Sequence, residues 1–114
     1  MSHITTHVLD TSRGRPAAGV SVSLFREREP ENWLIVAKGS TDADGRLKLS
    51  LFGGVVLEEG VYRLRFRTAA YFEAQGVEGF YPVVEIVFVV RDAAQHHHVP
   101  LLLSPYGYST YRGS

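Results

Sequence analysis

Three ionisable side chains, His7, Arg46 and His98, lie in segments that alternate between apolar and polar residues. Successive side chains of a strand point to opposite faces of a sheet, so each residue's face follows from its neighbours. All three fall on the face opposite to the predicted core. If their strands are neighbours in one sheet, they form a cationic, hydrogen-bonding cluster. Imidazoles exchange protons near neutral pH, and a guanidinium presents a planar fork of donors.

The first two of these faces follow from short alternating segments. Ile4 and Val8 are the apolar positions of the first segment, which leaves His7 on the other face. Leu47 begins the apolar set of a later segment, which leaves Arg46 on its other face. Parity alone does not exclude a simpler interpretation of Arg46 as a surface charge beside a turn.

The strand that begins at His98 is apolar on both faces. One face carries Val99, Leu101 and Leu103, and the other carries His98, Pro100 and Leu102. A strand that is apolar on both sides is usually buried on both sides. In a two-layer sandwich only another subunit covers the second face, so we expect an oligomer whose interface contains His98.

The other histidines favour simpler roles. We interpret them as surface or structural residues: His3, His96 and His97. A metal site is an alternative, because His96 and His98 share a face, His7 lies near, and zinc sites often use three histidines. No clear carboxylate is available to orient such ligands. The sequence therefore favours a site without metal.

The whole chain fits one domain, residues 1–114, since its 114 residues with 45% hydrophobic content suffice for one core. Its formal net charge of zero offers no field for nucleic acid or an anionic membrane. No apolar run approaches the ~20 residues of a membrane-spanning helix. The chain has no cysteine, and its first residues lack a secretory pattern, so we expect a cytoplasmic protein.

The pattern of short segments predicts an all-β fold. About eight alternating segments are separated by turn signals, which is typical of an antiparallel β-sandwich. Residues 68–76 have the one helical composition. Three arginines of the clearest strand share one face, and we expect that face to be solvated: Arg63, Arg65 and Arg67.

Both ends of the sequence carry a family resemblance. Residues 6–17 read THVLDTSRGRPA, and residues 99–114 read VPLLLSPYGYSTYRGS. These segments resemble the transthyretin-related proteins that act as 5-hydroxyisourate hydrolases, and the resemblance covers essentially the whole chain. The final Tyr-Arg-Gly-Ser is its most specific element, because it separates the hydrolases from transthyretin, the hormone-carrying branch of the same fold.

The resemblance implies a fold, an assembly and a site. The fold is a transthyretin-like β-sandwich of two four-stranded sheets with one short helix. The assembly is a homotetramer, a dimer of dimers, with active sites in the channel where the dimers meet. The implied catalytic residues are His7, Arg46, His98 and Ser114. The implied substrate-binding residues are His7, Arg46, Tyr111, Arg112 and Gly113. No metal or organic cofactor is implied.

The reaction also follows from the resemblance. Water would open the ring of 5-hydroxyisourate and give 2-oxo-4-hydroxy-4-carboxy-5-ureidoimidazoline, a step of urate degradation in purine catabolism. Such a cyclic amide hydrolase needs a base and a group that holds the developing oxyanion. Either His7 or His98 could be the base, with Arg46 on the substrate oxygens. The alternative is a transthyretin-like carrier that binds a small aromatic ligand in the same channel.

Overall fold

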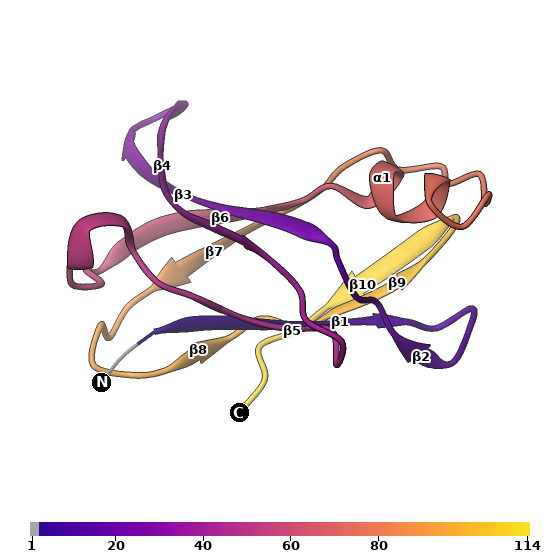
Figure 1. Cartoon of the computed structure of the whole chain (residues 1–114). Coiled ribbons are helices and arrows are strands. Elements are labelled where there is room, and N and C mark those ends of the chain that lie inside the picture. The colour runs from indigo at the N-terminus through magenta and orange to yellow at the C-terminus, as the bar shows by residue number, and fades with distance from the viewer. Residues whose placement is uncertain (1–2) are drawn as a thin grey trace.

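Two β-sheets face each other across a core, and one short helix lies at the end of the sandwich (Figure 1). The computed structural model describes residues 3–114. Its elements are β1 (Ile4–Asp10), β2 (Arg15–Pro16), β3 (Ser21–Glu29), β4 (Asn32–Ser40), β5 (Arg46–Leu49), the 3-10 turn η1 (Phe52–Gly54), β6 (Gly60–Phe66), α1 (Thr68–Glu73), β7 (Val84–Val90), β8 (His97–His98), β9 (Leu101–Ser104) and β10 (Gly107–Thr110). No helix within residues 3–114 is long and apolar enough to cross a membrane.

The strand order confirms the predicted transthyretin-like sandwich. One sheet has four strands in the order β4-β3-β6-β7, and all its pairs are antiparallel. The other has six strands in the order β10-β9-β1-β2, with β5 and β8 also paired to β1. It exceeds the predicted four because β2 and β8, of two residues each, are separate strands.

The expectation of a purely antiparallel sandwich was wrong for the second sheet. Strands β8 and β9 run parallel to β1. A tight hairpin forces its two strands to be antiparallel, but strands joined through a long excursion are free to be parallel. Here the chain leaves β1, builds the other sheet and then returns beside β1. Turn signals could not reveal this direction.

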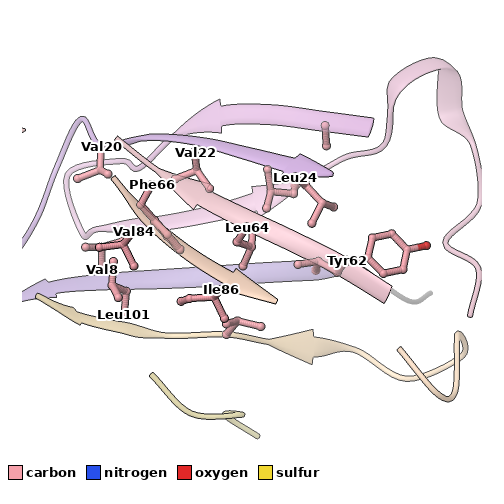
Figure 2. Packing of buried hydrophobic residues seen from close by; sticks show 14 of the residues in the cluster. Val8, Val20, Val22, Leu24, Tyr62, Leu64, Phe66, Val84, Ile86 and Leu101 are labelled. Atoms are coloured by element: carbon pink, nitrogen blue, oxygen red, sulfur yellow. The ribbon is translucent and has the colours of Figure 1, made fainter. Parts of the chain in front are cut away.

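Side chains from both sheets fill the space between them, as Figure 2 shows. The predicted alternation holds on β6, where Tyr62, Leu64 and Phe66 are buried. It holds equally on β1, where Ile4 and Val8 are buried. Truncating a buried aromatic side chain such as Phe66 to alanine typically costs about 3–5 kcal/mol. The apolar faces of the strands therefore fix which residues point outward.

A buried carboxylate joins the helix to the end of β1. Asp10 accepts hydrogen bonds from the backbone NH groups of Ser12 and Arg13, from the Ser12 hydroxyl and from the Tyr71 hydroxyl. Burial alone would raise the pKa of Asp10, but these hydrogen bonds together lower it below its ordinary value. The carboxylate therefore stabilises the fold above its unfolded pKa, and this contribution is lost as the pH falls through the folded pKa.

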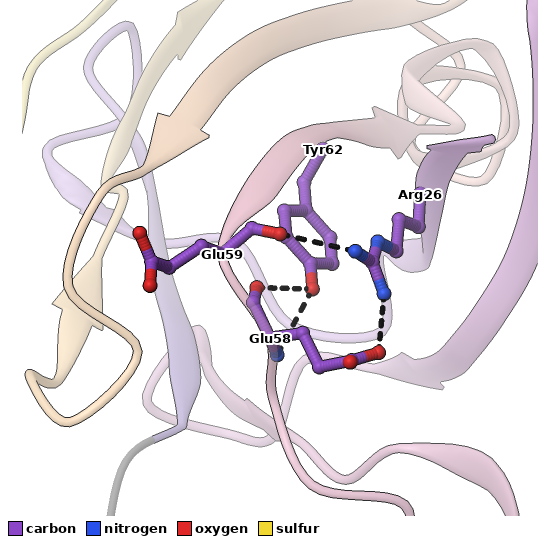
Figure 3. Close-up of polar contacts among 4 residues, drawn as sticks. All are labelled: Arg26, Glu58, Glu59 and Tyr62. Carbon is purple, nitrogen blue, oxygen red and sulfur yellow. Dashed lines mark hydrogen bonds and ion pairs between the residues drawn. The ribbon is translucent and has the colours of Figure 1, made fainter. Parts of the chain in front are cut away.

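A second polar cluster closes the loop that precedes β6 (Figure 3). Arg26 pairs with the Glu58 carboxylate at 2.5 Å and donates to the Glu59 carbonyl at 3.0 Å. The Tyr62 hydroxyl donates to the Glu58 carbonyl at 2.7 Å. These contacts all lie within the chain and tie the loop to β3 and β6, which is typical of a structural group of residues.

Candidate active site

The central strand β1 brings the three predicted ionisable residues together. His7 lies directly opposite Arg46 in the β1–β5 pair. Thr5, two residues earlier, lies opposite Lys48 on one side and His98 on the other. The three strands are therefore neighbours in one sheet, which was the condition for the predicted cluster. All five side chains stand on the face of the sheet turned away from the core.

A pocket of about 390 Å³ opens on this outer face. It is lined by Thr5, Thr6, Asp42, Arg46, Leu47, Lys48, His96, His98 and Ser114. Its volume lies in the range of small-molecule sites. Within residues 3–114, the Arg46 guanidinium forms no ion pair or hydrogen bond with another side chain, so it is available to a ligand.

A tight turn fixes the position of Arg46. The Asp42 carboxylate accepts from the backbone NH groups of Asp44 and Arg46, both at 2.9 Å. Gly45 has a φ of +74°, and a Cβ there would lie 2.4 Å from the carbonyl oxygen of Val8. Only glycine fits this close approach to β1. The turn therefore attaches Arg46 rigidly to the strand that carries His7.

His7 reaches this turn from β1. Its Nε2 lies 2.9 Å from the Asp44 carbonyl oxygen. A carbonyl oxygen only accepts, so Nε2 carries the proton and donates it. His7 is not among the residues that line the pocket. In this geometry it holds the turn next to Arg46.

His98 is part-buried at the pocket, and its Nδ1 lies 2.7 Å from the Thr5 hydroxyl oxygen. Burial lowers the pKa of His98, and electrostatic interactions with His96, Arg46 and His7 lower it further. His98 is consequently neutral near pH 7. A neutral imidazole keeps one nitrogen lone pair, which is what a general base needs.

The C-terminal tail (Tyr111–Ser114) returns across the outer face of this sheet, as Figure 1 shows. The backbone NH of Gly113 donates to the His98 carbonyl at 2.8 Å. A Cβ on Gly113 would lie 2.5 Å from the His98 ring carbon Cδ2, so a larger residue would push the tail away from the ring. Ser114 then lines the pocket.

Two predicted substrate-binding residues lie outside the pocket. Arg112 donates to the side-chain oxygen of Gln95 at 3.0 Å. Tyr111 is 56% exposed. The structure thus brings together Arg46, His98 and Ser114, sets His7 and Gly113 beside them, and leaves Tyr111 and Arg112 apart.

The tail also changes the inference drawn from the second apolar face of the last long strand. Pro100 is already buried within the single chain. Gly113 lies over its ring, and the Thr110 hydroxyl donates to its carbonyl at 2.7 Å. The expectation that only another subunit covers this face was therefore wrong for Pro100, because the chain folds back on itself. Leu102 stays half-buried.

Sequence reasoning missed five polar residues of the pocket: Thr5, Thr6, Asp42, Lys48 and His96. Parity could have found Thr5 and Lys48, since they share a face with His7 and Arg46. His96 was interpreted as a surface or structural residue. It is indeed exposed, but its Nε2 lies 2.7 Å from the Thr5 hydroxyl oxygen.

His97 points to the opposite side of β8. It is 4% exposed, and burial, followed by the charge of Arg112, lowers its pKa. This position agrees with a structural role. Among residues 3–114 there is no group of three or more His, Asp or Glu side chains arranged to hold a metal ion.

Comparisons with known proteins match this arrangement to one family. The HIUase/Transthyretin family matches residues 4–113. The chain belongs to this family. It is 50% identical to a 5-hydroxyisourate hydrolase of Caulobacter vibrioides, with all of both chains covered. The structure of the Klebsiella pneumoniae 5-hydroxyisourate hydrolase has a TM-score of 0.84 and 42% identity, again with all of both chains covered.

The carrier branch of the family is also close in structure. Sea bream transthyretin in complex with thyroxine has a TM-score of 0.87 and 33% identity, and the match covers 96% of this chain and 93% of that one. The family predicted from the sequence is thus confirmed. The fold is common to both branches, so the contents of the pocket must decide between them.

Proposed function

We propose that this protein hydrolyses 5-hydroxyisourate to 2-oxo-4-hydroxy-4-carboxy-5-ureidoimidazoline. The observation that carries the proposal is one pocket that holds the His98 imidazole, whose pKa is lowered, beside the Arg46 guanidinium, which has no ion pair within residues 3–114. The 50% identity to a hydrolase over the full length of both chains adds support. The whole of residues 1–114 would act as one hydrolase domain.

His98 is our choice for the general base. It lines the pocket, and its Nδ1 is engaged by Thr5, which leaves Nε2 for a water molecule. His7 is a poorer choice, because its Nε2 proton is directed to the Asp44 carbonyl. In the proposed step, His98 removes a proton from water as the oxygen attacks a ring carbonyl of the substrate.

Arg46 would bind the substrate oxygens. Attack of water places negative charge on the carbonyl oxygen, and a fixed guanidinium stabilises that charge without reorganising. The turn at residues 41–45 supplies the rigidity, since it leaves the backbone of Arg46 little freedom. His7 would support this geometry by holding the Asp44 carbonyl.

The C-terminal tail would complete the pocket. Ser114 would hydrogen-bond the substrate or the attacking water, and Gly113 would let the tail approach His98 closely. Tyr111 and Arg112 remain predicted substrate contacts. Since both lie outside the pocket of a single chain, such contacts depend on how the copies assemble.

The homotetramer, a dimer of dimers, is part of the same proposal. Exposed apolar side chains on edge strands of both sheets support it: Val87 and Val89 on β7 and Tyr108 on β10. Sedimentation or light scattering tests the assembly, and a stable, active monomer would contradict it. The cytoplasmic location also stays a prediction, to be tested by cell fractionation.

The direct test of the activity is the decay of freshly made 5-hydroxyisourate, followed by its ultraviolet absorbance. The protein should accelerate the decay far above the rate in buffer and yield the ring-opened carboxylate. The same preparation carrying His98→Ala controls for contaminating activity. A rate equal to that in buffer would refute the proposed function.

A transthyretin-like carrier is the second candidate, favoured by the likeness to the thyroxine complex. It predicts saturable binding of a small aromatic ligand without turnover. Isothermal titration with thyroxine, together with the decay assay, separates the two candidates. The cationic groups in the pocket, Arg46 and Lys48, favour an oxygen-rich substrate over an apolar one.

A further inference from the structure

We propose that Thr5 and His96 are positioning residues that hold His98 in the tautomer required of a base. The inference deepens the proposed hydrolase function and rests on it. It concerns two residues outside the catalytic and substrate-binding set that the family resemblance implies.

The geometry is a hydroxyl placed between two imidazoles. Thr5 Oγ1 lies 2.7 Å from His98 Nδ1 and 2.7 Å from His96 Nε2. Both distances are those of good hydrogen bonds. Thr5 is 91 residues from His96 and 93 residues from His98 in the sequence, so only the fold brings it to them.

Counting protons restricts the possible arrangements. A threonine hydroxyl has one proton to donate, so at most one of the two ring nitrogens can be its acceptor. If His98 is to act through Nε2, its own proton must be on Nδ1. That proton is donated to Thr5 Oγ1, and the Thr5 proton is then donated to Nε2 of His96. The chain of hydrogen bonds runs in one direction, from His98 to His96.

The surrounding contacts keep this arrangement in place. Thr5 is paired with His98 across β1 and β8, and the Thr5 carbonyl accepts from the Val99 NH at 2.9 Å. A β-branched side chain such as threonine has few rotamers, so its hydroxyl direction is restricted. Gly113 packs against the His98 ring from the tail. His96 is exposed, so water can satisfy its remaining ring nitrogen.

The two hydrogen bonds of Thr5 should differ in how strongly they affect His98. Thr5 contacts His98 directly, so its hydroxyl determines whether Nδ1–H has an acceptor. His96 acts one bond further away and gives the Thr5 proton a destination. Removing the hydroxyl should therefore affect His98 more than removing the His96 ring.

The test measures the tautomer of His98 in the full-length protein. Two-bond proton–nitrogen correlation spectra of ¹⁵N-labelled protein show which ring nitrogen carries the proton. Wild type and Thr5→Ser should show His98 with the proton on Nδ1, since serine keeps the hydroxyl. Thr5→Val should shift the population toward Nε2–H. His96→Leu should give a smaller shift in the same direction.

Kinetics provide the second measurement. Thr5→Val should lower kcat by about 10- to 100-fold, the range seen when a partner that orients a metal-bound histidine is removed. KM should change little, because the Thr5 hydroxyl is already engaged by the two imidazoles. Thr5→Ser should recover most of kcat. Thr11→Val is the matched control, because it removes a hydroxyl that bonds the Leu103 carbonyl outside the pocket.

Three results would overturn the proposal. They are an Nε2–H tautomer of His98 in the wild type, an unchanged tautomer in Thr5→Val, and equal kcat in Thr5→Val and the wild type. If the wild type does not hydrolyse 5-hydroxyisourate at all, the proposed function fails while the spectra still decide the tautomer. Should Thr5→Val not fold, the His96→Leu spectrum and kcat provide the same decision.

Discussion

The outer faces of the two sheets both carry arginines, but Arg65 and Arg46 differ in whether a carboxylate pairs with them. On β6, Arg65 pairs with Glu85 at 2.8 Å, and Arg63 lies 3.7 Å from the same carboxylate. The guanidinium of Arg63 also lies 4.7 Å from the Phe25 ring centroid. On β5, Arg46 has no such partner among the described residues and lines a pocket with His98.

This difference shows that strand parity alone does not identify a functional arginine. In sequence, Arg65 and Arg46 look alike, since each alternates with apolar residues on a strand. The first is neutralised by a cross-strand carboxylate, which is worth little at an exposed position. The second keeps its charge for a ligand and lowers the pKa of the imidazole beside it. Arg46 therefore differs from Arg65 in two respects: it lines a pocket, and no carboxylate pairs with it among the described residues.

The largest expected effect comes from removing the proposed base. His98→Ala should lower kcat by about 10²- to 10⁴-fold, the usual contribution of a general base. The oligomer and the circular dichroism spectrum should stay as in the wild type. The decay of 5-hydroxyisourate absorbance measures it, and full activity in a folded His98→Ala protein would remove His98 from the mechanism.

Replacing each of the two arginines by glutamine tests the comparison directly. Arg46→Gln should lower kcat/KM by about 10²- to 10³-fold, because the developing oxyanion loses its charged donor. The matched variant Arg65→Gln should retain wild-type turnover, since it breaks only a pair on the other face. Comparable losses in both variants would mean that the unpaired charge has no special role.

Removing residues 112–114 tests the docked tail. Activity should fall by about 100-fold, as for a misplacement of about 1 Å in a catalytic site. The thermal unfolding midpoint should change little, because these residues contribute no side chain to the core cluster. Differential scanning fluorimetry beside the decay assay separates the two effects. A truncated protein with full activity would contradict the assignment of Ser114.

The pH profile should show the charge of Arg46 acting on His98. His98 must be neutral to accept a proton, and its pKa lies below the ordinary 6.5, so kcat/KM should decline only below that pH. In Arg46→Gln the midpoint of this decline should rise, because one positive charge is gone. Arg46→Lys keeps the charge and should keep the low midpoint. Identical midpoints in all three proteins would contradict the electrostatic coupling.

The smallest effect is expected on the paired face. Glu85→Gln should lower the free energy of unfolding by about 0.2–1 kcal/mol, the range for exposed ion pairs. Turnover should not change. Urea denaturation at low and high salt measures the loss, which should shrink as salt screens the pair. A loss of activity here would show that both faces contribute to the site.

Much of the site was accessible from alternation, because period two is a local property of a strand. His7, Arg46 and His98 were assigned to the outer face correctly, since Ile4, Val8 and their counterparts are buried. The same alternation places Thr5 and Lys48 on this face, but nothing in the sequence indicated that they belong to a functional site. Alternation could not predict that the C-terminal tail covers Pro100, because this contact depends on the path of the chain in three dimensions.

The sequence by itself determined the alternating strands, the outward face of the ionisable residues and, through the motifs at both ends, the family. Local stereochemistry and apolar periodicity suffice for the first two. Only the tertiary structure decided that β5 and β8 both pair with β1, and that β8 runs parallel to it. The β1–β8 pairing joins Thr5 to His98, which are 93 positions apart, and it places the Thr5 hydroxyl between His96 and His98.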